Sequence, residues 1–151
     1  MSDSEPIIAL ENVYKIFGPN PRGRAFDLCS AGVGKDEVQR QTGHVVGMRD
    51  ISFEVQKGEI FVVMGLSGSG KSTAIRTVNK LHDVTHGRVL VEGTDVQQLR
   101  GAALQAFRRE KTAMVFQHFA LFPHRNVIDN TAYGLKVQGV DKKERHEAAI
   151  E

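Results

Sequence analysis

One segment of the sequence has residue types and a spacing that suit the binding of a polyphosphate. Residues 65–73, GLSGSGKST, fit the pattern G-x-x-x-x-G-K-[ST]. Glycine allows positive φ and a close approach of the backbone, so successive N–H groups can surround an anion. We expect the N–H groups of residues 68–72 to point at a β-phosphate. The nucleotide-binding residues predicted in this way are Gly65, Leu66, Ser67, Gly68, Ser69, Gly70, Lys71, Ser72 and Thr73.

Two side chains of this loop could act directly on a bound nucleotide. Lys71 is expected to bridge the β- and γ-phosphates as a point charge, and the Ser72 hydroxyl is expected to bind Mg²⁺. A helix that begins at the end of the loop would add unpaired N–H donors and the positive end of its dipole. The sequence therefore predicts a nucleoside triphosphate and Mg²⁺ as cofactors, with Lys71 in a catalytic role.

The elements on either side of the loop must hold it in place. The apolar run EIFVVM at 59–64 has the length of a strand and predicts a buried strand that is covered on both faces. After the loop the apolar period changes, and Ala74, Val78 and Leu81 recur at helical spacing. We therefore predict a strand over 59–64 and a helix over about 71–82.

The remaining pattern alternates strands and helices, which favours an α/β fold. Residues 19–47 differ from the neighbouring segments in composition, with Gly, Pro and charged residues. They are predicted to be a surface insertion with a short helix around 36–43. The last helix begins near 141 and continues to the end, so we expect the chain to be part of a longer protein. The other predicted elements are strands at 7–15, 51–56 and 87–93, a helix through Leu99, Ala103 and Phe107, a buried strand at 112–117, and a helix over 126–136.

Composition and charge exclude several classes of protein. The 151 residues are 40% hydrophobic and 25% charged, and 20 basic against 18 acidic side chains leave a net charge of +2. This balance is too even to predict nucleic-acid binding. The single Cys29 cannot form an internal disulfide, and no Cys or His cluster has metal-ligand spacing, which suits a reducing cytoplasm. The longest apolar run, IFVVMGL, has seven residues, against roughly 20 for a membrane span.

Phosphate loops occur in GTPases, kinases, helicases and transporter motors, so the loop alone does not identify the function. Guanine recognition would require N-K-x-D after a strand. The nearest match, NKLHD at 79–83, has its aspartate one residue late and lies on the predicted helix. We interpret it as a solvated helix end. A small-molecule kinase and a non-catalytic nucleotide-binding module remain as alternatives.

The order of four segments closely resembles the first half of an ATP-binding-cassette (ABC) transporter ATPase. These segments are ENVYKIFG, KGEIFVVMGLSGSGKST, GRVLVEGTDV and AMVFQHFALFPHRNVIDN. More narrowly, MGLSGSGKST, the VFQ-x-FAL-x-PH segment followed by V-x-DN, and the insertion at 19–47 resemble the ATPase subunits of the glycine betaine/proline betaine (quaternary amine) uptake family. The resemblance implies the α/β P-loop NTPase core of an ABC-type nucleotide-binding domain, with 126–151 as the start of its helical subdomain.

The resemblance implies roles for two further residues. Gln117 takes the place of the Q-loop glutamine, whose amide oxygen would approach Mg²⁺ and the attacking water. Phe17 takes the place of the aromatic residue that stacks on adenine, a contact worth roughly 1–3 kcal/mol by analogy with base–aromatic stacking. Tyr14 is the alternative for the stacking role, and both rings could instead fill the core. The nucleotide implied by the resemblance is ATP.

The resemblance also implies partners and a location. The apolar residues that follow Gln117, up to Pro123, are expected to receive a short helix of a membrane-embedded permease. This segment includes Phe119, Leu121 and Phe122. A second copy of the ATPase subunit would complete the site, a substrate-binding protein would be involved only indirectly, and no nucleic acid is expected. The assembly would lie peripherally at the cytoplasmic face of the inner membrane.

Part of the family's machinery has no counterpart in the sequence. It lacks an LSGGQ-type signature, a second apolar strand ending in Asp-Glu, and a switch histidine. The resemblance therefore implies two separate expectations. The full-length protein would hydrolyse ATP to import glycine betaine, proline betaine, choline or a similar osmoprotectant, whereas these 151 residues alone would bind ATP without appreciable turnover.

Overall fold

The computed structural model describes residues 5–117 and 121–151. The chain folds into two compact units, Met1–Leu99 and Arg100–Glu151. Each unit is described by itself below.

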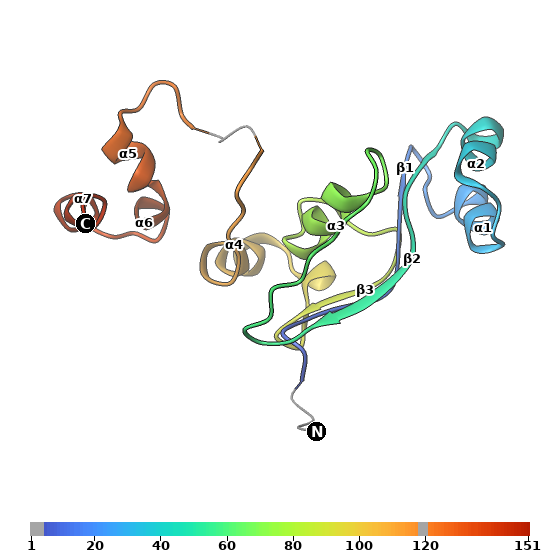
Figure 1. Ribbon diagram of the computed structural model, residues 1–151, viewed down its shortest axis with the longest axis horizontal. Helices are drawn as coiled ribbons and strands as arrows, with labels where there is room; N and C mark the ends of the chain where they lie inside the picture. Colours follow the sequence, from blue (N-terminus) through green and yellow to red (C-terminus); the bar gives the residue numbers. More distant parts are fainter. Residues whose placement is uncertain (1–4, 118–120) are drawn as a thin grey trace. The chain divides into compact units, whose positions relative to one another are not determined.

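The first unit is built on a four-stranded antiparallel sheet with the order β2-β1-β3-β4 (Figure 1). The strands span Ile8–Phe17 (β1), Val45–Val55 (β2), His86–Val91 (β3) and Thr94–Asp95 (β4). The three longer strands confirm those predicted at 7–15, 51–56 and 87–93. Strand β2 begins six residues earlier than predicted, and its first part pairs with the end of β1.

A bulge between β1 and β2 sets which side chains of β1 face the core. Asn12 and Asp50 adopt positive φ angles of 47° and 48°, and the Asn12 amide donates to the Asp50 carboxylate over 3.0 Å. The extra residue changes the alternation of β1 locally. As a result Leu10, Val13 and Ile16, spaced by three residues, are all buried.

The insertion at 19–47 contains two helices, of which only the second was predicted. Helix α1 spans Arg24–Ser30 and helix α2 spans Lys35–Thr42. Ala25, Cys29 and Val38 from these helices form a small core with Ile16 of β1, and all four are at most 1% exposed. The insertion is thus packed onto one end of the sheet by its own apolar contacts (Figure 1).

Arg49 of β2 holds the connection between these two helices. Its guanidinium donates to the carbonyl of Gly32 over 3.4 Å and also to the carbonyl of Val33. A second link joins the helices to each other, because Arg24 donates to the Gln41 side chain over 3.1 Å. The turn that precedes α2 is therefore tied to the middle of β2.

Helix α3 spans Lys71–Val78 and confirms the helix predicted after the loop, but it ends four residues early. The cause is Lys80, which adopts a left-handed φ of 52° and is only 6% exposed. Its ammonium donates to the carbonyls of Gln97 and Leu99 over 3.0 and 2.6 Å. Gln97 belongs to a short 3-10 helix, η1, at Val96–Gln98. These bonds fix the chain in a turn that a continuing helix would not allow.

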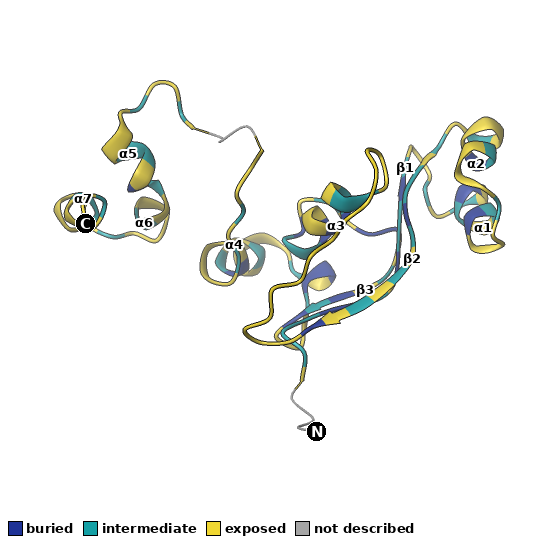
Figure 2. Cartoon of the chain, viewed as in Figure 1, coloured by how far each residue is buried: buried dark blue, intermediate teal, exposed yellow. Residues whose placement is uncertain are grey.

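The prediction of a buried strand at 59–64 is wrong. These residues have no strand pairing in the structure, and all of 56–69 is exposed (Figure 2). Ile60, Val62 and Met64 are 90%, 67% and 86% exposed, while Phe61 stacks on Phe53 of β2 with ring centroids 4.7 Å apart. Apolar composition suits a strand, but a strand also needs neighbouring strands to pair with its N–H and C=O groups.

The prediction of a buried strand at 112–117 is wrong for the same reason. These residues are assigned to neither helix nor strand. Val115 is 96% exposed and Phe116 is 41% exposed, so core packing does not explain Phe116.

The second unit consists of four helices within the part of the chain that the structure describes. They are α4 at Gly101–Glu110, α5 at Val127–Thr131, α6 at Tyr133–Val137 and α7 at Lys142–Ala148. The single helix predicted over 126–136 is divided at Ala132, which ends α5 and precedes α6. Among the described residues, no helix has the length and apolar character required to cross a membrane.

Candidate functional site

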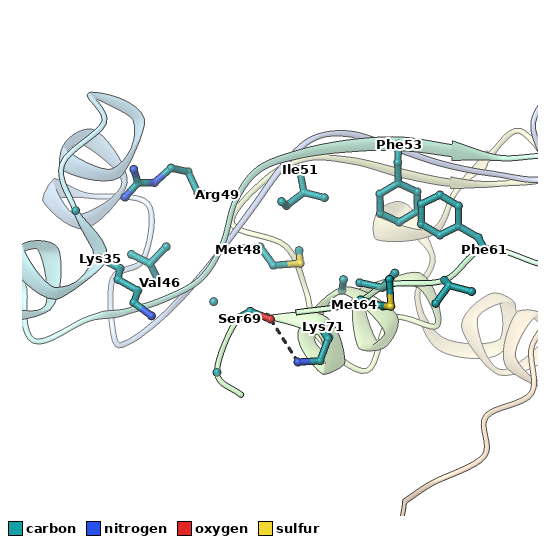
Figure 3. A pocket seen from close by; sticks show the side chains of 17 residues that line it. Lys35, Val46, Met48, Arg49, Ile51, Phe53, Phe61, Met64, Ser69 and Lys71 are labelled. Carbon is teal, nitrogen blue, oxygen red and sulfur yellow. Dashed lines mark hydrogen bonds between the residues drawn. The ribbon is translucent and has the colours of Figure 1, made fainter. Parts of the chain in front are cut away.

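The phosphate-loop candidate forms a turn whose oxygen atoms surround the ammonium group of Lys71. This group donates to the carbonyls of Gly65 and Leu66, both over 2.7 Å, and lies 3.4 Å from the Ser69 hydroxyl (Figure 3). Ser69 closes the turn with a backbone bond to the Leu66 carbonyl over 3.2 Å. The cation is thus held inside the loop, where it can exchange carbonyl partners for phosphate oxygens.

Gly70 joins the loop to α3 in a conformation that suits glycine. It is the N-cap of α3 with φ 97°, and Gly68 has φ 76°. A Cβ at Gly70 would lie 2.2 Å from the carbonyl oxygen of Gly47 in β2. A Cβ at Gly68 would have no atom within 4 Å. The loop is therefore packed against β2 on one side and open on the other.

These features fit a nucleotide with Mg²⁺. The loop offers a cation, an open side at Gly68 and the first turn of a helix, which together suit a polyphosphate. Among residues 5–117 and 121–151, no group of three or more Cys, His, Asp or Glu side chains is placed to hold a metal ion. Mg²⁺ commonly keeps several waters and takes few protein ligands beside phosphate oxygens, so the exposed Ser72 hydroxyl suits this role.

A cavity of about 650 Å³ lies beside the loop in the first unit (Figure 3). One wall is apolar and comes from β2 and from residues 61–64, with Phe53 and Phe61 stacked at one end. Lys35 at the start of α2 lies toward the other end, and residues 68–71 of the loop also line the cavity (Figure 3). The loop therefore borders a space that also includes the insertion.

Phe17 lies at the end of β1, close to the phosphate loop. A Cβ at Gly47 would meet the edge of the Phe17 ring at 2.7 Å, and Gly47 is the same residue whose carbonyl touches Gly70. One residue of β2 thus separates the predicted base-stacking ring from the loop. The Lys15 ammonium lies 4.8 Å from the centre of the ring, and the His82 ring meets it edge-to-face at 5.4 Å.

Tyr14, the alternative stacking residue, has different surroundings. Its ring packs edge-to-face against Phe26 at 5.3 Å and against His86 at 6.1 Å, next to the core of the insertion. Burial, followed by the nearby Asp50 carboxylate, raises the pKa of the Tyr14 phenol. This geometry favours Phe17 for contact with a base, because Tyr14 packs with the insertion.

Gly47 is a site residue that the sequence analysis missed. A glycine inside a strand often marks a close approach of another group. Here two groups approach it, the Phe17 ring and the loop at Gly70. The signal is weak from sequence alone, since it does not reveal which group comes close.

The surroundings of His82 favour its neutral form. Burial, and then the positive charges of Lys15 and Arg76, hold the pKa of His82 below its ordinary value of 6.5. Burial also lowers the pKa of Lys15. The cluster around Phe17 therefore disfavours additional positive charge.

This shift predicts a loss of stability in mild acid. Because the unfolded chain binds a proton at position 82 more readily than the folded chain, the free energy of unfolding should fall as pH decreases through about 6.5. The variant His82→Gln should show a shallower fall. Urea unfolding of both proteins at about pH 8 and pH 5.5 measures how far the free energy of unfolding falls between the two pH values. An equal fall in the free energy of unfolding for the wild type and for His82→Gln would contradict the lowered pKa of His82.

Gln117 lies in the second unit, in an exposed stretch that is neither helix nor strand. The phosphate loop belongs to the first unit, so the predicted approach of Gln117 to Mg²⁺ remains a prediction.

The predicted partner-contact segment is described in part. Phe119 falls within 118–120, which lie outside the described residues. Leu121 is 68% exposed and Phe122 is half-buried, while Pro123 is exposed. The Phe122 ring contacts Tyr133 with centroids 4.6 Å apart. The segment therefore combines one anchored ring with one exposed apolar side chain.

Comparison with known proteins gives clear similarities. Residues 48–151 match the family model described as "ABC transporter". The chain is 46% identical to the glycine betaine/proline betaine transport system ATP-binding protein ProV of Escherichia coli (strain K12), over 95% of this chain and 36% of that protein. It is 44% identical to the trimethylamine N-oxide transport system ATP-binding protein TmoW of Ruegeria pomeroyi, over 97% of this chain and 42% of that protein. The chain thus spans less than half the length of these relatives.

A solved structure supports the fold. The chain matches a dimeric ATP-binding cassette in a post-hydrolysis state, bound to ADP and Pi, with a TM-score of 0.74 and 25% identity. The match covers 95% of this chain and 54% of the cassette. It confirms the predicted fold class, the α/β core of a cassette ATPase.

Proposed function

Because this chain belongs to the ABC transporter family, we propose that it is the ATP-binding part of an importer that couples ATP hydrolysis to the uptake of a methylated amine. The solute class comprises glycine betaine, proline betaine, choline and similar osmoprotectants. The observation that carries the proposal is the loop at 65–73, in which the Lys71 ammonium is surrounded by loop oxygens at the start of α3.

Each part of the site has a distinct role in binding. Loop N–H groups and the Lys71 ammonium bind the β- and γ-phosphates, and Phe17 stacks on the adenine. The Ser72 hydroxyl would hold Mg²⁺, which when bound would neutralise charge on the transferred phosphoryl group. Gln117 orients the attacking water. An uncharged amide oxygen suits this role, since it can accept a hydrogen bond from water without competing for the metal.

Two relatives support the solute class. One is named for glycine betaine and proline betaine transport and the other for trimethylamine N-oxide transport. All three solutes are small, methylated at nitrogen and without net charge. The ATP-binding part does not itself contact the solute, so the proposal rests on these names for the class of solute only.

The proposed assembly contains two copies of the ATPase subunit and a membrane-embedded permease, which contacts the segment 117–123. The similar cassette is dimeric, which supports the first part. The exposed Leu121 in this segment supports the second. We place the subunit peripherally at the cytoplasmic face of the inner membrane.

The variant Gln117→Ala in the full-length transporter tests this proposal. It should bind MgATP with nearly wild-type affinity but lose most ATP-driven uptake, by about tenfold or more, because coupling and water positioning fail. Calorimetry measures the binding, and uptake of labelled glycine betaine into vesicles measures the transport. Gln138→Ala, which changes an exposed glutamine of the second unit, is the control.

Two outcomes would contradict the proposal. Wild-type uptake by the Gln117→Ala variant would show that Gln117 has no role in coupling. Transfer of the γ-phosphate to a small acceptor instead of water would indicate a kinase.

A further inference from the structure

One asparagine side chain holds the segment that precedes α5. The Asn130 Oδ1 atom accepts the backbone N–H of Phe122 over 2.8 Å. Its Nδ2 atom donates to the carbonyl of Phe122 over 3.2 Å, to that of Arg125 over 3.1 Å and to that of Asn126 over 3.0 Å. The same side chain therefore bonds to three residues of the turn 122–126.

The turn has little regular structure to hold it otherwise. A backbone bond within it runs from the N–H of Arg125 to the carbonyl of Phe122 over 3.1 Å. An amide side chain offers one acceptor and two N–H donors, and at Asn130 the acceptor is used and three carbonyls share the two donors. Only a primary amide at this position supplies both kinds of bond.

Side-chain contacts complete this arrangement. The Arg125 guanidinium lies 4.8 Å from the ring centres of both Phe122 and Tyr133. Phe122 is thus fixed at its backbone by Asn130 and at its ring by Arg125 and Tyr133. The residue before it, Leu121, is left 68% exposed at the edge of this fixed structure.

We propose that Asn130 is a positioning residue that holds Leu121 and the turn 122–126 in the conformation that contacts an apolar helix of the permease. This inference rests on the proposed function. A binding segment that is ordered before contact loses less conformational entropy on binding, which increases affinity and keeps the contact stiff enough to transmit motion. Asn130 does not touch ATP, so it acts on coupling and not on nucleotide binding.

The variant Asn130→Asp in the full-length transporter tests the inference. It keeps the shape of the side chain, removes both donors and places a negative charge next to three carbonyl oxygens. The carboxylate can still accept the Phe122 N–H, but its repulsion of the three carbonyls should open the turn. Amide hydrogen exchange at Arg125, whose N–H bonds to the Phe122 carbonyl, should therefore become about tenfold faster. The KM for ATP should stay unchanged, while ATP-driven uptake should fall about five- to tenfold. The control is Thr131→Ala, since this neighbouring side chain bonds within α5, to the carbonyl of Val127 over 3.0 Å.

The outcomes separate this inference from the proposed function. If Leu121→Ala lowers uptake and Asn130→Asp does not, the positioning role is overturned and the proposed function stands. If neither Leu121→Ala nor Gln117→Ala affects uptake, the proposed function fails. Faster exchange at Arg125 with normal uptake would show that Asn130 stabilises the turn without serving coupling, and would overturn the inference.

Discussion

Replacing Lys71 with alanine is expected to weaken MgATP binding at least about a hundredfold, because a charge-assisted contact to two phosphates is lost. The ammonium already lies inside the loop, bonded to the carbonyls of Gly65 and Leu66 over 2.7 Å each. Its removal therefore also leaves these oxygens facing the incoming phosphates without a compensating charge. Isothermal titration with MgATP measures the effect.

Two control variants make the Lys71 result specific. Lys57→Ala removes an exposed lysine from the turn before the loop and should leave MgATP affinity unchanged. Lys71→Arg keeps the charge but replaces a compact ammonium by a planar group, so it should recover only part of the affinity. Wild-type affinity in Lys71→Ala, with an unchanged circular dichroism spectrum, would contradict the role of the loop.

The second large effect is expected for Gly70→Ala. The new Cβ would lie 2.2 Å from the Gly47 carbonyl oxygen, and φ is 97° at this position. Overpacking and left-handed strain together should cost about 2–5 kcal/mol of stability, or displace the loop from β2. Both responses should lower MgATP affinity. Urea unfolding and calorimetry measure the two quantities.

Gly68→Ala is the matched control for this variant. Gly68 also has positive φ, 76°, but its Cβ would meet no atom within 4 Å. It should therefore show only the conformational cost, about 1–2 kcal/mol. Equal losses of stability in the two variants would show that contact with Gly47 has no part in the effect.

The candidate site was predictable where its chemistry is local in sequence. The loop at 65–73 is a continuous motif, and its glycines and Lys71 are found in the turn that the motif requires. Gly47 was not predictable, because its role depends on the approach of Phe17 and Gly70 from other parts of the chain. Likewise, the bonds from Asn130 to residues four to eight positions earlier depend on a turn that no periodicity indicates.

The strands of the fold were predictable from their residue types, even where their partners are distant in sequence, as for the pair Ile8 and Val91. Strand β1 pairs with β2 on one side and with β3 on the other. Alternation indicated β2, and residue types bounded by turn signals indicated β1 and β3. The runs at 59–64 and 112–117 have equally strong apolar composition but form no strand in the structure. Helix α1 was missed because its seven residues are too few to establish a helical period.

The bonds from Arg49 to the carbonyls of Gly32 and Val33 have a mechanical consequence for the insertion. Arg49 lies two residues from Gly47, which is close both to the Phe17 ring and to Gly70 of the phosphate loop. A molecule that reorients helix α2 through this guanidinium is expected also to move Gly47, and with it the Phe17 ring for which we propose the adenine contact. By thermodynamic reciprocity, ATP would then change the affinity of that molecule by the same factor.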